Sequence, residues 1–322
     1  MVKFSRIIPT LILFWVAFAP SNSFAQYYYY NDKYYDSPFI IEIGGSLGSM
    51  NSLTDLGGQK GTGKKFIKDI NLGNAAFAGG VYAALTYNSL IGIRIEGTHS
   101  NISANDSILA GKTDEVSAAR YNRNLSFRSK LTEIMVLAEF HPLAAFLNRE
   151  TPPRFSPYVL GGVGQFFFNP QARLNNEWVN LQPLRTEGQG FAEYPDRKPY
   201  ALNGICIPVG FGFKYDISTI ANIKGEFLYR STNTDYLDDV SKTYIDKTLY
   251  QRYFAGDPVK INNAIQLTDR QRGADPTQTA DGAKRGNPSQ NDNYFSFSLK
   301  MAVTLMGRER IKPKQKKWSC YW

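Results

Sequence analysis

The stretch IGIRIE, residues 91–96, decides the fold class of this chain. Isoleucine takes every second position, and Gly92, Arg94 and Glu96 occupy the positions between. Side chains along a β-strand point alternately to its two faces, so this strand has an apolar face and a charged face. A soluble β-sandwich also alternates, but it does not require aromatic residues near its strand ends. In a membrane barrel the apolar face contacts lipid and the polar face lines the interior.

Eight segments are long enough to cross a bilayer as tilted strands of about 9–11 residues. They are Phe39–Gly48, Ala75–Leu85, Ile91–Ile102, Leu125–His141, Pro157–Phe168, Leu202–Asp216, Asn222–Arg230 and Tyr294–Met306. Long and short linkers alternate between them, and in outer-membrane barrels the long loops are extracellular. The sequence therefore predicts an all-β fold, an eight-stranded antiparallel transmembrane β-barrel over residues 39–306 with long extracellular loops. Both termini are then periplasmic.

The first 25 residues have the pattern of a secretory signal peptide. Lys3 and Arg6 precede an apolar run, Ile7–Phe18, and small residues at Ser23 and Ala25 form a cleavage site. The alternative is an uncleaved N-terminal anchor. Cleavage after Ala25 leaves a tyrosine-rich periplasmic segment, residues 26–38, and no later run of ~18 apolar residues that would span as a helix. These features predict export to the outer membrane, among its lipids.

The formal net charge of +9 is concentrated in one place. The tail, residues 307–322, holds six of the 37 basic residues and a single glutamate. The basic character therefore describes a periplasmic tail and does not indicate nucleic acid as a partner.

Parity within the strands predicts which charges face the barrel interior. The set is Glu42, Arg94, Glu96, Glu139, Lys214, Lys224, Glu226, Arg230 and Lys300. An eight-stranded barrel is just wide enough for its own side chains to fill, so these charges are expected to pair and plug it. The alternative is a selective ion path. Parity fails between Leu131 and Ile134, which predicts a β-bulge there.

Few residues offer chemistry, and we expect no catalytic residue, cofactor or metal. The two histidines, His99 and His141, have no nucleophile at a recognisable spacing. Asp235, Asp238 and Asp239 follow the seventh strand and offer carboxylates for Ca²⁺, but the spacing and central glycine of a calcium loop are missing. We favour one helical turn capped by Thr234 or Asp235, with Arg230 paired to an aspartate. The polar region Asp257–Asn293 is predicted to be flexible.

An ordered series of motifs resembles a known family. The series is PYVLGGVG at 157–164, TEGQG at 186–190, KPYALNGICIPVGFGFKY at 198–215, and TDYLDDVS at 234–241. It is similar to a family of small outer-membrane barrels that includes the PorG-like barrel subunit of the type IX protein secretion system. TEGQG and TDYLDDVS are its most specific parts. The resemblance implies a barrel attached to the other type IX secretion subunits, among them a periplasmic ring built of a lipoprotein and a partner.

The tail also contains a cysteine beside aromatic residues, since Cys320 lies close to Trp322. Cys206, the other cysteine, points by parity into the barrel, so an internal disulfide is not expected. An unpaired cysteine in an exported protein indicates intermolecular pairing or a reactive thiol. Aromatic residues anchor interfaces, and lysines favour acidic surfaces or headgroups. The partner-binding residues are predicted to be Lys316, Lys317, Trp318, Cys320, Tyr321 and Trp322.

The sequence thus predicts a non-enzymatic component of a protein secretion machine. Cys320 would form a disulfide with the ring lipoprotein that the resemblance implies. One alternative is a tail whose aromatic residues only enter the membrane interface. Another is an adhesin-like barrel that binds external ligands through its long loops.

Overall fold

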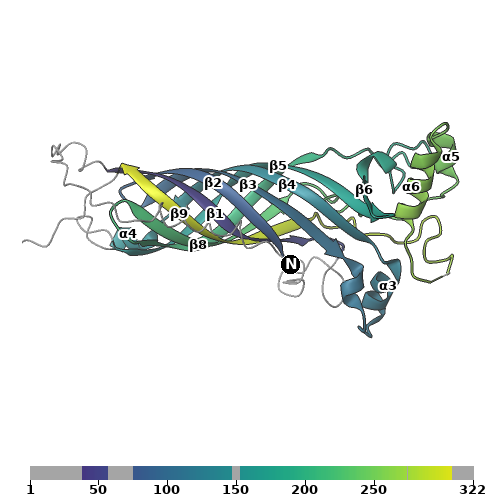
Figure 1. Ribbon diagram of the computed structural model, residues 1–322, viewed down its shortest axis with the longest axis horizontal. Helices are drawn as coiled ribbons and strands as arrows, with labels where there is room; N and C mark the ends of the chain where they lie inside the picture. Colours follow the sequence, from purple (N-terminus) through teal and green to yellow (C-terminus); the bar gives the residue numbers. More distant parts are fainter. Residues whose placement is uncertain (1–37, 57–74, 147–152, 274, 307–322) are drawn as a thin grey trace, which may run out of the picture. The chain divides into compact units, whose positions relative to one another are not determined.

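All eight predicted segments form strands, and hydrogen bonds join them into a closed antiparallel barrel (Figure 1). The computed structural model describes residues 38–56, 75–146, 153–273 and 275–306. The ring runs β4-β3-β2-β1-β9-β8-β7-β5, and pairing of β4 with β5 closes it. The predicted fold class is therefore confirmed. The predicted signal peptide and tail lie outside the described residues, as do residues 26–37.

The elements have the following bounds. The barrel strands are β1 (Phe39–Leu53), β2 (Ala76–Tyr87), β3 (Ile91–Asn105), β4 (Ser126–Phe140), β5 (Phe155–Leu174), β7 (Asn203–Asp216), β8 (Ala221–Thr232) and β9 (Asn293–Met306). The remaining elements are β6 (Glu177–Asn180), α3 (Glu115–Arg123), α4 (Pro142–Phe146), α5 (Leu249–Tyr253), α6 (Pro258–Thr268) and the 3₁₀ turns η3 (Asp106–Leu109) and η4 (Gln182–Leu184).

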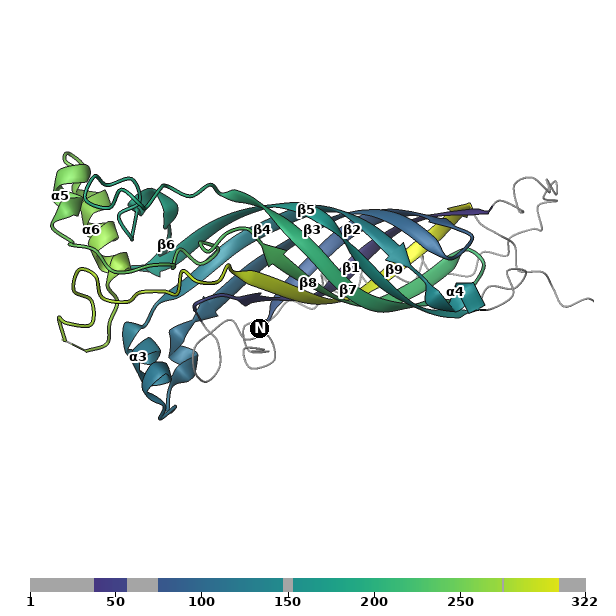
Figure 2. The same ribbon diagram turned by 180° about the vertical axis from the view of Figure 1, so that it is seen from behind.

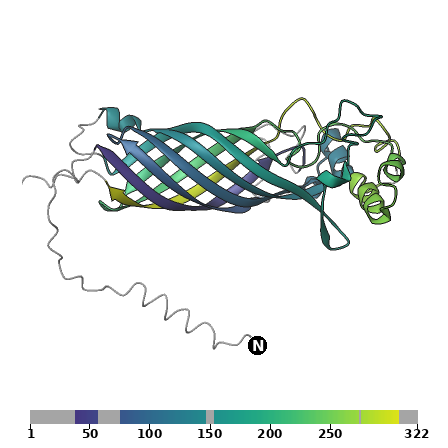
Figure 3. The ribbon, with the colours of Figure 1, turned by 90° about the horizontal axis from the view of Figure 1, so that it is seen from above.

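Long and short connections separate to the two ends of the barrel. Figure 3 shows the tilted strands, with the helices of the long loops beyond one end. The short β2–β3 turn is tight because Asn88 and Ser89 both adopt positive φ, 51° and 57°, as two-residue hairpin turns require. β1 begins and β9 ends at the end opposite the long loops, since Ile41 pairs with Met306.

The loop helices begin and end where the sequence supplies caps. Asp114 accepts a hydrogen bond from the Ser117 amide at 3.1 Å, and Asn124 ends α3 in the left-handed conformation. Asp257 caps α6 in the same way, accepting from the Lys260 amide at 2.9 Å. Figure 2 shows the β5–β6 hairpin continuing from the barrel wall toward α5 and α6.

The barrel turns its apolar side chains outward. Exposed examples from seven of its strands are Ile43, Val81, Ile93, Ile134, Val163, Phe211 and Leu299. An apolar surface of this extent is unfavourable in water but favourable in contact with lipid chains. Among the described residues, no helix is long and apolar enough to cross a membrane.

Two sequence predictions about the fold are wrong. β4 keeps its register with both neighbours from end to end, so it has no bulge, and Leu131, Met135 and Leu137 all face inward. The register shift lies instead between Ile41 and Glu42, where β1 pairs with β9. The region Asp257–Asn293 is largely folded, because it contains α6 and buries Arg285 and Asp292.

Candidate functional site

Three long loops fold together into a cap at one end of the barrel. The cap consists of residues 106–125, 175–202 and, apart from residue 274, 233–292. Its apolar residues join the upper barrel in one core that includes Leu125, Phe168, Leu184, Phe191, Leu237, Tyr250 and Leu267. The loops therefore form a folded unit rather than separate excursions.

A buried ion pair lies at the centre of the cap. Arg285 donates from Nη1 to Glu187 Oε1 at 2.9 Å, and both side chains are almost completely buried. Glu187 also accepts from the backbone amides of Ser241 and Lys242, at 2.9 and 3.0 Å. The carboxylate is therefore bonded on both oxygens, as a buried charge must be.

Asp239 completes this group. Its carboxylate accepts from the Thr186 hydroxyl at 2.5 Å and from the Tyr200 hydroxyl at 2.6 Å. Arg285 donates to the Asp239 carbonyl oxygen at 2.6 Å. We call Thr186, Glu187, Asp239 and Arg285 the clasp, because it joins the β5–β7 loop to the β8–β9 loop. TEGQG and TDYLDDVS, the two segments that carry the sequence resemblance, meet here.

The clasp gives the cap a pH dependence. Burial raises the pKa of Asp239 from 3.8 to about 6, against the attraction of Arg285 and the hydrogen bond from Thr186. A folded pKa above the unfolded value means that the stabilisation is full below pH 3.8 and is lost as the pH rises through 6. We expect cap stability to fall by about 2–3 kcal/mol between about pH 4 and 6.5.

Hydrogen exchange of cap amides, corrected for intrinsic rates, measures this change. Asp239→Asn should flatten the profile, and asparagine tolerates the positive φ of 66° at this position. The barrel amides serve as the internal control. A profile that stays steep in Asp239→Asn would assign the pH dependence to another group.

The second candidate site is the barrel lumen, where charges of both signs alternate in space. Arg94 is completely buried and forms ion pairs with Glu96 at 3.1 Å, Glu139 at 2.9 Å and Glu226 at 2.8 Å. Lys300 pairs with Glu96 at 2.5 Å and with Glu226 at 2.9 Å. Each charge therefore meets at least one of opposite sign.

The luminal charges nearly balance in number, with Asp216 at the open end as one further acid beside Lys214. The described luminal residues Arg94, Lys214, Lys224, Arg230 and Lys300 face Glu42, Glu96, Glu133, Glu139 and Glu226. Aromatic and aliphatic side chains fill the space between them, among them Tyr82, Met135, Leu137, Tyr158, Leu160 and Leu228. The prediction of a paired, filled interior therefore agrees with the geometry, and every residue predicted to face inward does so.

One predicted pairing is wrong. Arg230 does not reach the aspartates that follow β8; its guanidinium bonds Glu133 inside the barrel at 2.6 Å. Tyr294 donates to the same carboxylate at 2.7 Å. The predicted inward set lacks Glu133, which lies in the stretch of β4 where the sequence predicts a bulge.

The acidic cluster is a turn rather than the start of a helix. Asp238 accepts from the amides of Leu56 and Val240, at 3.1 and 3.0 Å, and Asp235 is half-buried. The Asp239 amide donates to the Tyr236 carbonyl, which closes the turn. No group of three or more potential metal ligands occurs among the described residues.

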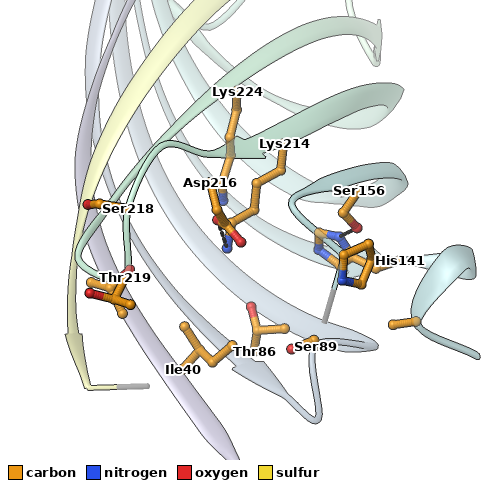
Figure 4. Close-up of a pocket in the computed structure, with 13 residues that line it drawn as sticks. Ile40, Thr86, Ser89, His141, Ser156, Lys214, Asp216, Ser218, Thr219 and Lys224 are labelled. Atoms are coloured by element: carbon orange, nitrogen blue, oxygen red, sulfur yellow. Dashed lines mark hydrogen bonds and ion pairs between the residues drawn. The ribbon is translucent and has the colours of Figure 1, made fainter. Parts of the chain in front are cut away.

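The barrel end opposite the cap opens into a small polar mouth (Figure 4). His141 lies beside Ser156, with Nδ1 and Oγ 3.0 Å apart, and Lys214 lies 3.6 Å from Asp216. The cavity between them has a volume of about 60 Å³, enough for a few water molecules. It lies next to the points where β1 begins and β9 ends.

A larger cavity, of about 570 Å³, lies in the cap. One side is α3, with Val116, Arg120 and Arg123; the other is the β8–β9 loop, with Tyr244 and Lys284. The volume is that of a small-molecule site. No sequence pattern indicates this cavity, because its two walls come from distant parts of the chain.

The predicted partner-binding residues cannot be placed. Lys316, Lys317, Trp318, Cys320, Tyr321 and Trp322 lie outside the described residues. Cys206 is completely buried, as parity predicts, and forms no disulfide with any residue that the structure describes. The disulfide of Cys320 stays a prediction.

Comparison with known proteins finds similarity in structure alone. No family model and no curated protein matches the sequence. Neisserial surface protein A is 10% identical, over 83% of this chain and 97% of that one, with a TM-score of 0.35. The outer membrane protein OprG from Pseudomonas aeruginosa is 11% identical, over 83% and 92%, with a TM-score of 0.30. A major outer membrane protein from Thermus thermophilus is 11% identical, over 82% and 99%, with a TM-score of 0.32. These values are too low for any residue or activity to be transferred.

Proposed function

We propose that this chain is a non-enzymatic, non-conducting barrel of the outer membrane that serves as a fixed platform in type IX protein secretion. The observation that carries the platform role is the lumen, in which five basic and five acidic side chains pair across a filled interior. A barrel closed in this way offers its two ends for contacts. In this proposal the cap is extracellular and both termini are periplasmic.

The secretion role in this proposal comes from the sequence resemblance. TEGQG and TDYLDDVS are bonded to each other through Glu187 and the amide of Ser241, and through the Thr186 hydroxyl and Asp239. Two motifs that act as one structural unit support the resemblance more than two separate short matches would. The tail would then anchor the lipoprotein ring through its aromatic residues, with Cys320 forming a disulfide to that partner.

Experiments on the tail, residues 307–322, test the proposed secretion function. In outer membranes separated without reductant, we expect a band of higher mass that collapses on reduction and disappears in Cys320→Ser. Co-purification from mild detergent should recover the periplasmic partner with the wild type. Removing residues 307–322 should abolish both the recovery and secretion, because the aromatic anchors are lost as well.

Cys206→Ser is the matched control, since its thiol is buried in the barrel. It should leave the higher-mass band unchanged. Monomeric migration of the wild type, together with normal secretion by the truncated chain, would contradict the proposal.

The cap cavity favours a second candidate function, binding of an external ligand. Its volume of about 570 Å³ and its walls, in which apolar surface adjoins charged side chains such as Arg120 and Lys284, suit a small amphipathic molecule or a side chain of a partner. Lys284→Glu changes an exposed charge at the cavity wall. Loss of surface binding in this variant, with secretion intact, would favour the adhesin-like function over the secretion platform.

A further inference from the structure

Three basic side chains form a strip on the outer face of the barrel. We call Arg128 and Lys130 of β4 and Arg173 of β5 the basic strip. Strand pairing places them on one face: Arg128 lies opposite Gln171, and Arg173 lies opposite Trp178 of β6. Gln171 accepts from Arg128 at 2.9 Å, which fixes the register of the strip across the two strands.

The basic strip begins where the apolar belt ends. Ile134 and Val136 face lipid and are 56% and 47% exposed. Thr132 follows on the same face, and Lys130 comes next, about 7 Å farther along the strand. That step carries the side chain out of the hydrocarbon and into the layer of lipid headgroups.

The charges of the strip are largely uncompensated. The side chains of Lys130 and Arg173 make no hydrogen bond or ion pair with any residue that the structure describes, and both are exposed. Strand parity places no carboxylate on the outward faces of β3, β4, β5 or β6. Arg128 stacks on Trp178, with 3.7 Å between its guanidinium carbon and the ring centre.

We propose that the basic strip binds the phosphate groups of an anionic glycolipid in the leaflet at the cap end of the barrel. Guanidinium groups bind phosphate oxygens in pairs, and a lysine adds a point charge. The amides of Asn169, Gln171 and Asn180 lie beside the strip and already bond one another, which orders the surface before the lipid arrives. The position rests on the proposed membrane location.

The fluorescence of Trp178 measures lipid binding directly, because Arg128 of the basic strip stacks on its ring. Trp178 is the one tryptophan among the described residues, so Trp318→Phe and Trp322→Phe leave a single probe in the mature chain. We expect its fluorescence to titrate with diphosphoryl lipid A in neutral detergent. Each cation near a charged surface contributes about five-fold in affinity, so Arg128→Gln, Lys130→Gln and Arg173→Gln together should weaken binding on the order of 100-fold.

The single substitution Lys130→Gln controls for misfolding, because the Lys130 side chain makes no polar contact with a described residue. It should weaken lipid A binding about five-fold. Lys112→Gln, Arg154→Gln and Lys198→Gln remove three exposed cations elsewhere and should change little. Dephosphorylated lipid A and free inorganic phosphate should both bind poorly. Equal loss in the two triple variants, or equal binding of the dephosphorylated lipid, would overturn the proposal, while heat-modifiable migration would still support the membrane barrel.

Discussion

Arg94→Met is expected to lower the free energy of unfolding of the barrel by about 3–5 kcal/mol. Arg94 is the counter-ion of Glu96, Glu139 and Glu226, all within 3.1 Å of its guanidinium. Methionine fills much of the space but leaves carboxylates in an interior that water does not reach freely. Urea titration in detergent, followed by the loss of the fast-migrating folded band, measures the change.

A second substitution tests whether loss of the counter-ion causes the drop in stability. Adding Glu139→Gln to Arg94→Met removes one of the three carboxylates that lose their arginine partner, and it should recover part of the loss. Lys130→Met, a cation on the outer face, should stay within about 0.5 kcal/mol of the wild type. An unfolding free energy of Arg94→Met equal to that of the wild type would mean that the luminal charges do not hold the barrel together.

Arg285→Met should open the cap while the barrel remains folded. The substitution leaves the buried carboxylate of Glu187 without its cation, beside Asp239, and we expect the cap to lose about 3–5 kcal/mol of stability. Brief proteolysis should then cut within the β8–β9 loop. The barrel should keep its heat-modifiable migration, because its luminal charges are untouched.

Lys284→Met is the matched control for this experiment. Lys284 is adjacent and basic, but it is exposed and the structure gives it no ion pair with any described residue. Its protease resistance should match that of the wild type. If Arg285→Met resists proteolysis equally, packing of the apolar core rather than the clasp holds the loops together.

The barrel could be predicted because period-two alternation is visible in the sequence. The prediction fails in β4, where apolar residues at 131, 135 and 137 lie on the same side as Glu133 and Glu139. A narrow lumen is packed like a protein core, so it accepts apolar residues beside charges. Apolar character then no longer distinguishes the inward face of the strand from the outward face, and Glu133 is missing from the predicted inward set.

The cap is harder to predict for a different reason. Residues 257–293 are polar in composition, which favours flexibility. Their order depends on Arg285 meeting Glu187, 98 residues earlier in the chain. No local pattern predicts a contact between residues so far apart in the sequence, although TEGQG and TDYLDDVS contain three of the four members of the clasp.

The luminal ion pairs bear on how the barrel assembles. Glu42 and Lys214 are 172 residues apart in the sequence, and Glu96 and Lys300 are 204 apart. A hairpin that entered the bilayer by itself would bring such charges into hydrocarbon without their partners, at about 2–4 kcal/mol for each lysine near the midplane and less for each glutamate. Stepwise insertion is therefore unfavourable. The first and last strands have to enter the membrane together. Membrane entry and ring closure are then one cooperative step, because partly inserted barrels have too high a free energy to be populated.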